Sequence, residues 1–82
     1  PGSWLLDCSA ATQNLLLAAH ALGLGAVWVH MLWRDSAGPL RDRLGLPEHI
    51  RTLALVPIGY AVEPPGIKDR YRPERVHRNR WE

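Results

Sequence analysis

The sequence predicts an α+β fold in which one apolar helix is covered by short strands and a smaller second helix. Three features lead to that prediction. An apolar stretch from residue 8 to residue 22 has helical character and stops at Gly23 and Gly25. Two apolar stretches rich in β-branched residues follow at 26–30 and 52–60, and a proline-rich, basic segment closes the chain.

Composition indicates one small globular unit. The chain has 82 residues, of which 46% are hydrophobic and 22% are charged, and this balance argues against disorder. The formal net charge of +2 comes mostly from the tail and is weak evidence for nucleic-acid binding. We expect residues 1–82 to form one unit, with a helix and strand core over 1–60 and an extended basic arm over 61–82.

The cysteine content and the hydropathy pattern indicate the compartment. The single cysteine, Cys8, cannot form an internal disulfide, and this favours a reducing compartment. The longest apolar run, 15–29, is interrupted by His20 and two glycines and is shorter than the ~20 residues that span a membrane. We therefore expect a cytoplasmic protein without a membrane segment or signal peptide.

The first helix is apolar on nearly all sides. Asp7 or Ser9 is expected to cap its start, because a short side-chain oxygen accepts hydrogen bonds from the first turn. At about 100° per residue, Ser9, Gln13 and His20 share one narrow polar stripe. Leucine and alanine fill most of the remaining surface: Ala10, Ala11, Leu15, Leu17, Ala18, Ala19, Ala21 and Leu22. A helix of this kind needs cover on several sides.

The chain is too short to provide that cover alone. Domains of this size bury only about 60% of the surface that their unfolded chains expose. We infer that the helix packs against a partner. This partner is a second copy of the chain, the rest of a longer parent chain, or both.

The segments on either side of the first helix are apolar as well. Trp4, Leu5 and Leu6 precede it and predict a hydrophobic staple over its first turn. Residues 26–30 read Ala-Val-Trp-Val-His, with little polar alternation. This pattern predicts an interior strand that is covered on both faces.

The second half of the core is predicted to be a surface helix followed by a strand. The helix runs over 36–44, with Asp35 or Ser36 as its cap, Pro39 in its first turn and Gly45 at its end. Residues 46–49 predict a turn, and 52–60 predict the second strand. Since Pro57 cannot donate to a ladder, this strand is expected to bulge, bend or lie at an edge there. Beyond it, we expect an extended arm whose terminal Trp81 docks elsewhere.

Several segments together resemble the C-terminal half of the FMN-dependent nitroreductase family. Each segment alone is a weak signal, but their order and spacing make a strong one. They read NLLLAAHALGLGAVWV, RDRLGLPEHI, LALVPIGYAVE, IKDRYRPERV and HRNRW. The resemblance implies a partial α/β/α sandwich within a homodimeric flavoenzyme, with FMN at the subunit interface and the long helix in the dimer core.

The same resemblance implies an activity. In this family NADH or NADPH reduces FMN, and the reduced flavin then reduces a second substrate such as a nitro compound or a quinone. The family's N-terminal half, which carries an arginine-serine phosphate segment and a loop near the flavin, has no counterpart in these residues. We therefore expect the 82-residue chain alone to be inactive.

Two clusters match cofactor-binding positions of the family. Trp28, Val29 and His30 match the strand end whose main chain approaches the flavin ring, where a backbone N–H steers flavin protonation. The alternative is that Trp28 and Val29 are ordinary core residues and that His30 only ends the strand.

Lys68 and Arg70 match a basic pair that meets the FMN phosphate. Alternation on an extended arm places both side chains on one face, and a phosphate needs charge-assisted donors. The alternative is a solvated run of charges, and Arg72, Arg75, Arg78 and Arg80 are expected to be solvated or paired with Glu74 and Glu82.

No side chain is predicted to be catalytic and no metal site is predicted. The four histidines, His20, His30, His49 and His77, have no metal-ligand spacing, and neither Cys8 nor Ser9 has a nucleophile motif around it. The flavin would provide the redox chemistry.

Three hypotheses for function follow. The leading one is part of an FMN oxidoreductase that passes electrons from NAD(P)H to a small-molecule acceptor. The second is a non-catalytic dimerisation or regulatory module derived from that fold. The third, a nucleic-acid-binding domain, is disfavoured because the tail has few aromatic residues and its acids offset much of its charge.

Overall fold

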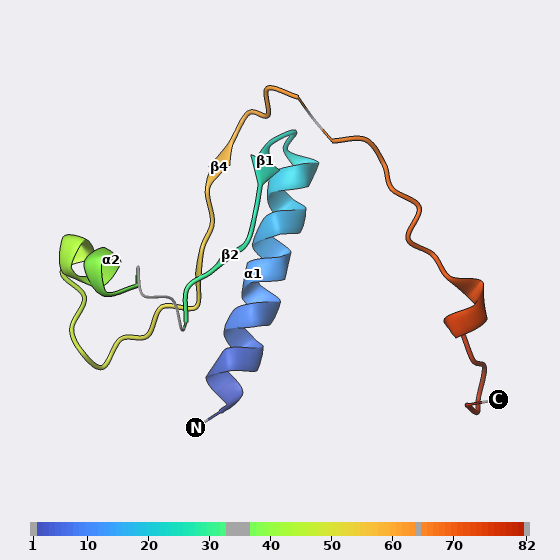
Figure 1. Ribbon diagram of the computed structural model, residues 1–82, viewed down its shortest axis with the longest axis horizontal. Helices are drawn as coiled ribbons and strands as arrows, with labels where there is room; N and C mark the ends of the chain where they lie inside the picture. The colour runs from blue at the N-terminus through green and yellow to red at the C-terminus, as the bar shows by residue number, and fades with distance from the viewer. Residues whose placement is uncertain (1, 33–36, 64, 82) are drawn as a thin grey trace.

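The computed structural model describes residues 2–32, 37–63 and 65–81, and within them the chain has the predicted α+β architecture (Figure 1). A long helix lies beside a two-stranded ribbon, with a short helix at one end and an arm that leaves from the other. The elements are α1 (Ser3–Ala21), β1 (Gly25–Ala26), β2 (Val29–His30), α2 (Ala37–Leu44), β3 (Ala54–Leu55), β4 (Ile58–Gly59) and the 3₁₀ turn η1 (Pro73–Arg75).

The four short strands form one antiparallel ribbon with an interruption at its middle. The pairing register is the same on both sides of the interruption, so no residue is inserted or skipped in either strand. The pairs are Gly25 with Gly59, Ala26 with Ile58, Val29 with Leu55 and His30 with Ala54. Each of the two predicted strands is therefore present, but each is split in two.

Pro57 explains the interruption. In this register it lies opposite Val27, and it has no N–H to donate. The Met31 N–H donates to the Leu53 carbonyl at 2.9 Å. Because hydrogen-bonded pairs alternate along an antiparallel ladder, positions 27 and 57 belong to the bonded set, where a missing donor breaks the ladder. The predicted irregularity at Pro57 is confirmed.

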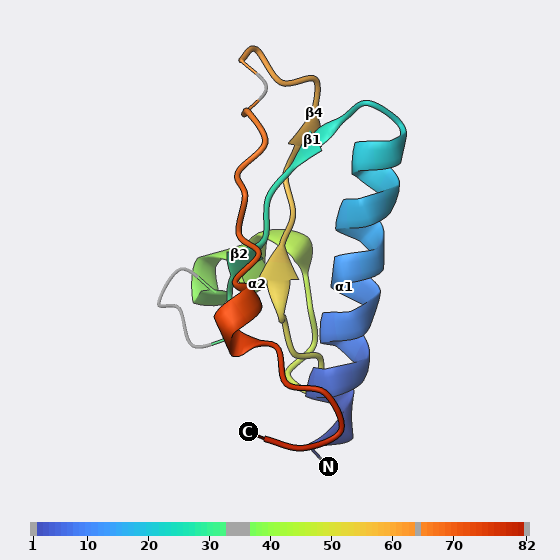
Figure 2. The same ribbon diagram turned by 90° about the vertical axis from the view of Figure 1, so that its right-hand side faces the viewer.

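One stripe of α1 faces the ribbon. The stripe repeats at helical spacing, is half-buried or buried, and consists of Leu5, Ser9, Thr12, Leu16 and Ala19. Figures 1 and 2 both show β1 alongside the C-terminal part of α1. Among the described residues, Ala19 and Met31 are the two that are buried, so this packing forms a very small core.

The start of α1 differs from the prediction. The helix begins at Ser3 behind Gly2, which makes no side-chain cap hydrogen bond, so Asp7 and Ser9 lie inside the helix. Trp4, Leu5 and Leu6 likewise form its first turns instead of a staple. The physical reason is packing: half-buried Leu5 extends the ribbon-facing stripe by one more turn.

Both helices end where the sequence predicts. After α1, the Leu24 N–H donates to the Ala19 carbonyl and the Gly23 N–H to the His20 carbonyl, which is a Schellman motif. Gly23 has a φ of +78° and Gly45, which follows α2, has a φ of +66°. The predicted turn closes with the Ile50 N–H on the Pro47 carbonyl at 3.1 Å. The predicted caps Asp35 and Ser36 lie outside the described residues.

The prediction that the first strand is covered on both faces is wrong for this chain. His30 is exposed, and Val27 keeps 54% of its surface in water. The outer face of α1 is also uncovered, with Leu17 at 58% and Leu22 at 75% exposure. The reason is length, because α1 covers one face of the ribbon and no described element covers the other.

The overall dimensions indicate the same deficit of cover. The radius of gyration is 17.1 Å, whereas a compact chain of this length has about 12 Å. The accessible surface is 7599 Å², against about 4,900 Å² for a compact monomer of this mass. The excess is of the order that an obligate interface buries.

The arm leaves the ribbon after β4 and runs apart from both α1 and the ribbon (Figure 1). Every residue described between 65 and 81 is exposed. Trp81 does not dock on the core: its ring stacks on His77 with centroids 4.5 Å apart, and the residue is 83% exposed. The arm has no strand or α-helix among its described residues, and η1 is a short turn within it.

We predict that Gly23→Ala destabilises the protein by about 1 kcal/mol, because a Cβ is disfavoured at positive φ. Gly2→Ala is the matched control. A Cβ at either glycine would meet open space, but Gly2 has a φ of −85°, so the two variants differ in backbone strain. Urea denaturation of both variants measures the difference. Equal midpoints would contradict this account of the helix end.

We also predict that Ala18→Arg disrupts self-association. Ala18 lies on the uncovered apolar face of α1, and an unpaired charge buried in an interface costs about 3 kcal/mol or more. Association should weaken roughly a hundredfold. Gln13→Arg replaces an exposed polar residue of the same helix and should change association little. Light scattering tests this, and a stable wild-type monomer at micromolar concentration would refute it.

Candidate functional site

The first predicted cluster lies at the centre and one end of the ribbon. Trp28 sits in the interruption and is half-buried, Val29 pairs with Leu55 and is half-buried, and His30 pairs with Ala54 and is exposed. Exposed His30 thus ends β2, whereas Trp28 and Val29 are partly covered by neighbouring residues. This placement is compatible both with a ligand at the strand end and with ordinary strand packing.

The ladder geometry determines where the backbone of this cluster points. Since Met31 and Val29 occupy hydrogen-bonded positions, the N–H groups of Trp28 and His30 point to the outer edge of the ribbon, away from β3. Among the described residues, no further strand pairs with that edge. Outward-pointing N–H groups are the kind of donor that a planar ligand with hydrogen-bonding atoms along one side needs.

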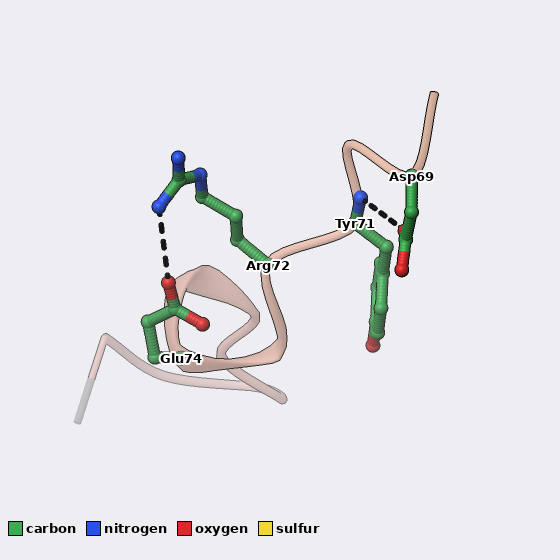
Figure 3. Close-up of polar contacts among 4 residues, drawn as sticks. All are labelled: Asp69, Tyr71, Arg72 and Glu74. Carbon is green, nitrogen blue, oxygen red and sulfur yellow. Dashed lines mark hydrogen bonds and ion pairs between the residues drawn. The ribbon is translucent and has the colours of Figure 1, made fainter. Parts of the chain in front are cut away.

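The second predicted cluster lies on the arm. Lys68 and Arg70 are exposed, and neither forms an ion pair with another described residue. Asp69 between them accepts a hydrogen bond from the Tyr71 N–H at 3.1 Å, which orders the backbone locally (Figure 3). The pair therefore has its donors available for an anion.

Arg72 differs from that pair. Its guanidinium lies 3.7 Å from the Glu74 carboxylate, and both side chains are about two-thirds exposed (Figure 3). A pair this exposed contributes little stability. It does, however, partly satisfy the charge of Arg72, as the sequence analysis anticipates.

The structure does not bring the two clusters together. Trp28 to His30 lie on the ribbon, whereas Lys68 and Arg70 lie on the arm, which runs apart from the ribbon in Figure 1. A single ligand that touches both clusters therefore needs a second copy of the chain or a different course of the arm.

A hollow in the described surface lies apart from both clusters. It has a volume of about 450 Å³ and surrounds the turn after α1, between Leu16, His20 and Tyr60. Its size suits a small ligand, but none of the five predicted residues lines it and it has no lysine or arginine. It is therefore a poor place for a phosphate.

The described residues contain neither a metal cluster nor a spanning helix. No group of three or more His, Cys, Asp and Glu side chains in residues 2–32, 37–63 and 65–81 could hold an ion. None of the helices in those ranges has the length and hydropathy needed to cross a bilayer.

The pattern that predicts a surface helix over 36–44 does not predict a role for Arg41. Its guanidinium donates to the carbonyls of Pro47, at 2.8 Å, and Ile50, and so ties α2 to the following turn. The available signal was its place near the helix end, just before a Leu-Pro-Glu turn whose carbonyls need donors.

Comparison with known proteins gives a consistent picture. The model of the nitroreductase family matches residues 4–60. A Methanothermobacter thermautotrophicus protein named "Putative NADH dehydrogenase/NAD(P)H nitroreductase" is 45% identical over 82 residues, which cover 99% of this chain and 43% of the relative. The NADPH-flavin oxidoreductase of Vibrio harveyi is 36% identical over 94% of this chain and 32% of its own length.

A solved structure matches as well. A crystal structure of a protein with the same name as the first relative, from Parabacteroides distasonis, superposes with a TM-score of 0.83 at 45% identity. The match covers 96% of this chain and 48% of that one. The chain thus spans about half the length, or less, of the relatives that it matches.

Proposed function

The chain belongs to the nitroreductase family, and we propose that it forms part of an FMN-dependent oxidoreductase that passes electrons from NAD(P)H to a nitro, quinone or related small-molecule acceptor. The oxidoreductase class follows from the family and from relatives named for nitroreductase and flavin oxidoreductase activity. FMN as the cofactor and the identity of the acceptor are the proposed parts.

The observation that supports FMN most directly is the uncommitted cationic pair on the arm. A flavin mononucleotide needs charge-assisted donors for its phosphate and hydrogen-bond partners along one edge of its ring. Lys68 and Arg70 have charge-assisted donors for a phosphate, and both are exposed without ion-pair partners among the described residues. The outward-pointing N–H groups of Trp28 and His30 are hydrogen-bond donors of the kind that the ring edge needs. The residues present therefore fit the group.

The proposed roles are those of binding and orientation. Lys68 and Arg70 bind the phosphate, and the main chain of Trp28, Val29 and His30 holds the edge of the ring by donating a hydrogen bond to it. When bound, FMN supplies the transfer of electrons between donor and acceptor. No side chain of the chain is proposed as a catalytic acid, base or nucleophile, because the two clusters contribute contacts and not bond cleavage.

A homodimer, or association with the remaining half of the domain, is the proposed assembly. The uncovered apolar face of α1 and the surface excess support it. Because the two clusters lie apart within one copy, a dimer also provides a way to bring the arm of one subunit near the ribbon of the other. We further propose a cytoplasmic protein, since its single cysteine suits a reducing compartment.

The alternative is a non-catalytic dimerisation or regulatory module of the same family. The exposed face of α1 suits that role equally well, so FMN binding separates the two. A folded assembly that contains the remaining half of the domain and takes up no flavin would favour the module and would exclude the oxidoreductase.

We predict that Lys68→Ala and Arg70→Ala each weaken FMN binding by about ten- to a hundredfold. A charge-assisted hydrogen bond contributes about 1.5 to 3 kcal/mol, and about 1.4 kcal/mol is tenfold in affinity. The measurement is a flavin-fluorescence titration of the associated protein. The exposed arm makes no core contact, so the melting temperatures of the apo variants should not change.

Arg72→Ala is the matched control, because Arg72 lies on the same arm but next to Glu74. It should bind FMN like the wild type. If all three variants bind FMN equally well, the phosphate assignment is wrong. If the apo forms of the first two melt much lower, the pair instead holds the arm to its own protein.

A further inference from the structure

A smaller hollow beyond the end of β2 has a basic wall. It has a volume of about 180 Å³ and is lined by Leu32, Arg41, Glu48, Arg51 and Thr52. We call it the α2 hollow. The ribbon register continues through Met31 and Leu53, so Leu32 and Thr52 face each other where the two strands diverge. All five lining residues fall between 32 and 52.

Arg41 is hydrogen-bonded to the backbone in this wall. Its guanidinium donates to the Pro47 carbonyl at 2.8 Å and also to the Ile50 carbonyl. A guanidinium has five N–H donors in a fixed plane, so donors remain for a ligand. Because the backbone already fixes the side chain, binding costs less conformational entropy than it would for a free arginine.

The remaining lining favours an oxyanion. Arg51 adds a second guanidinium and half-buried Thr52 adds a hydroxyl, whereas Glu48 is the one carboxylate of the lining. Neither arginine forms an ion pair within the part of the chain that the structure describes. The lining thus has a net charge of +1, and guanidinium groups match phosphate or carboxylate oxygens in pairs.

We propose that the α2 hollow binds a phosphate group of the nicotinamide donor. This identification of the ligand rests on the proposed oxidoreductase function, whereas binding of a phosphate oxyanion follows from the hollow itself. Leu32 follows His30 by two residues, which is about 7 Å along an extended chain. The hollow is therefore next to the edge proposed to hold the flavin ring, where the nicotinamide donor must approach.

The first experiment titrates the purified protein with inorganic phosphate and follows the backbone amide resonances of Arg51 and Thr52 by NMR. Arg51→Gln should weaken phosphate binding about tenfold, as expected for the loss of one charge-assisted hydrogen bond. Glu48→Gln removes the opposing charge and should strengthen binding severalfold. Arg43→Gln, on the same helix but outside the lining, should have no effect. Unchanged affinity in both lining variants overturns the proposal.

The second experiment measures steady-state kinetics with each donor, using the FMN-loaded assembly that contains the remaining half of the domain. Arg51→Gln should raise KM and leave kcat nearly unchanged. A rise for NADPH alone identifies the 2′-phosphate as the ligand, and an equal rise for NADH and NADPH identifies the diphosphate that they share. Unchanged KM for both donors overturns the nucleotide assignment. If the protein takes up no FMN, the proposed function fails, while the phosphate titration still decides whether the hollow is an anion site.

Discussion

The contact between one stripe of α1 and the ribbon is the interaction on which the rest of the structure depends. Leu16 and Ala19 lie on the side of the helix that packs against the strands. The Schellman motif at Gly23 reverses the chain, so that β1 follows the helix after a short turn. A two-stranded ribbon is marginally stable alone, so this helix is what makes it persist. The contact uses one side of each partner and leaves the other sides apolar and exposed.

The uncovered surfaces are typical of an element that packs against a partner. Its accessible surface exceeds that of a compact monomer of its mass by an amount typical of obligate interfaces. Alanines on the outer side of α1 let another backbone approach closely, and leucines between them provide the area to bury. The cover that the helix needs therefore has to come from outside the described residues.

The ribbon also connects fold with function. Pro57 breaks the ladder at its middle, and the constant register on both sides keeps Trp28 and His30 at positions whose N–H groups point outward. The same register runs on to Leu32 and Thr52, where the strands diverge and the α2 hollow opens. The proposed flavin edge at Trp28 and His30 is therefore followed, two residues further along the chain, by Leu32 of the α2 hollow. The cationic pair on the arm lies apart from both.

The local features were predictable from sequence because short-range physics decides them. Gly23 and Gly45 end their helices, since each needs a positive φ, and Pro57 interrupts its strand because it has no donor. The nearly all-apolar first helix indicated a missing partner, and the family resemblance identified the fold. The five predicted site residues remain predictions about ligand contacts, although the structure gives each of them a position.

Other features were decided by tertiary structure. Packing of Leu5 moved the start of α1 to Ser3, against the local capping signals of Asp7 and Ser9. The direction of the Trp28 and His30 N–H groups follows from pairing with a strand some twenty-five residues away, and the clamp of Arg41 on Pro47 and Ile50 follows from the path of a turn. Sequence periodicity reports which side chains share a face, but hydrogen-bond partners distant along the chain are chosen only when the elements pack.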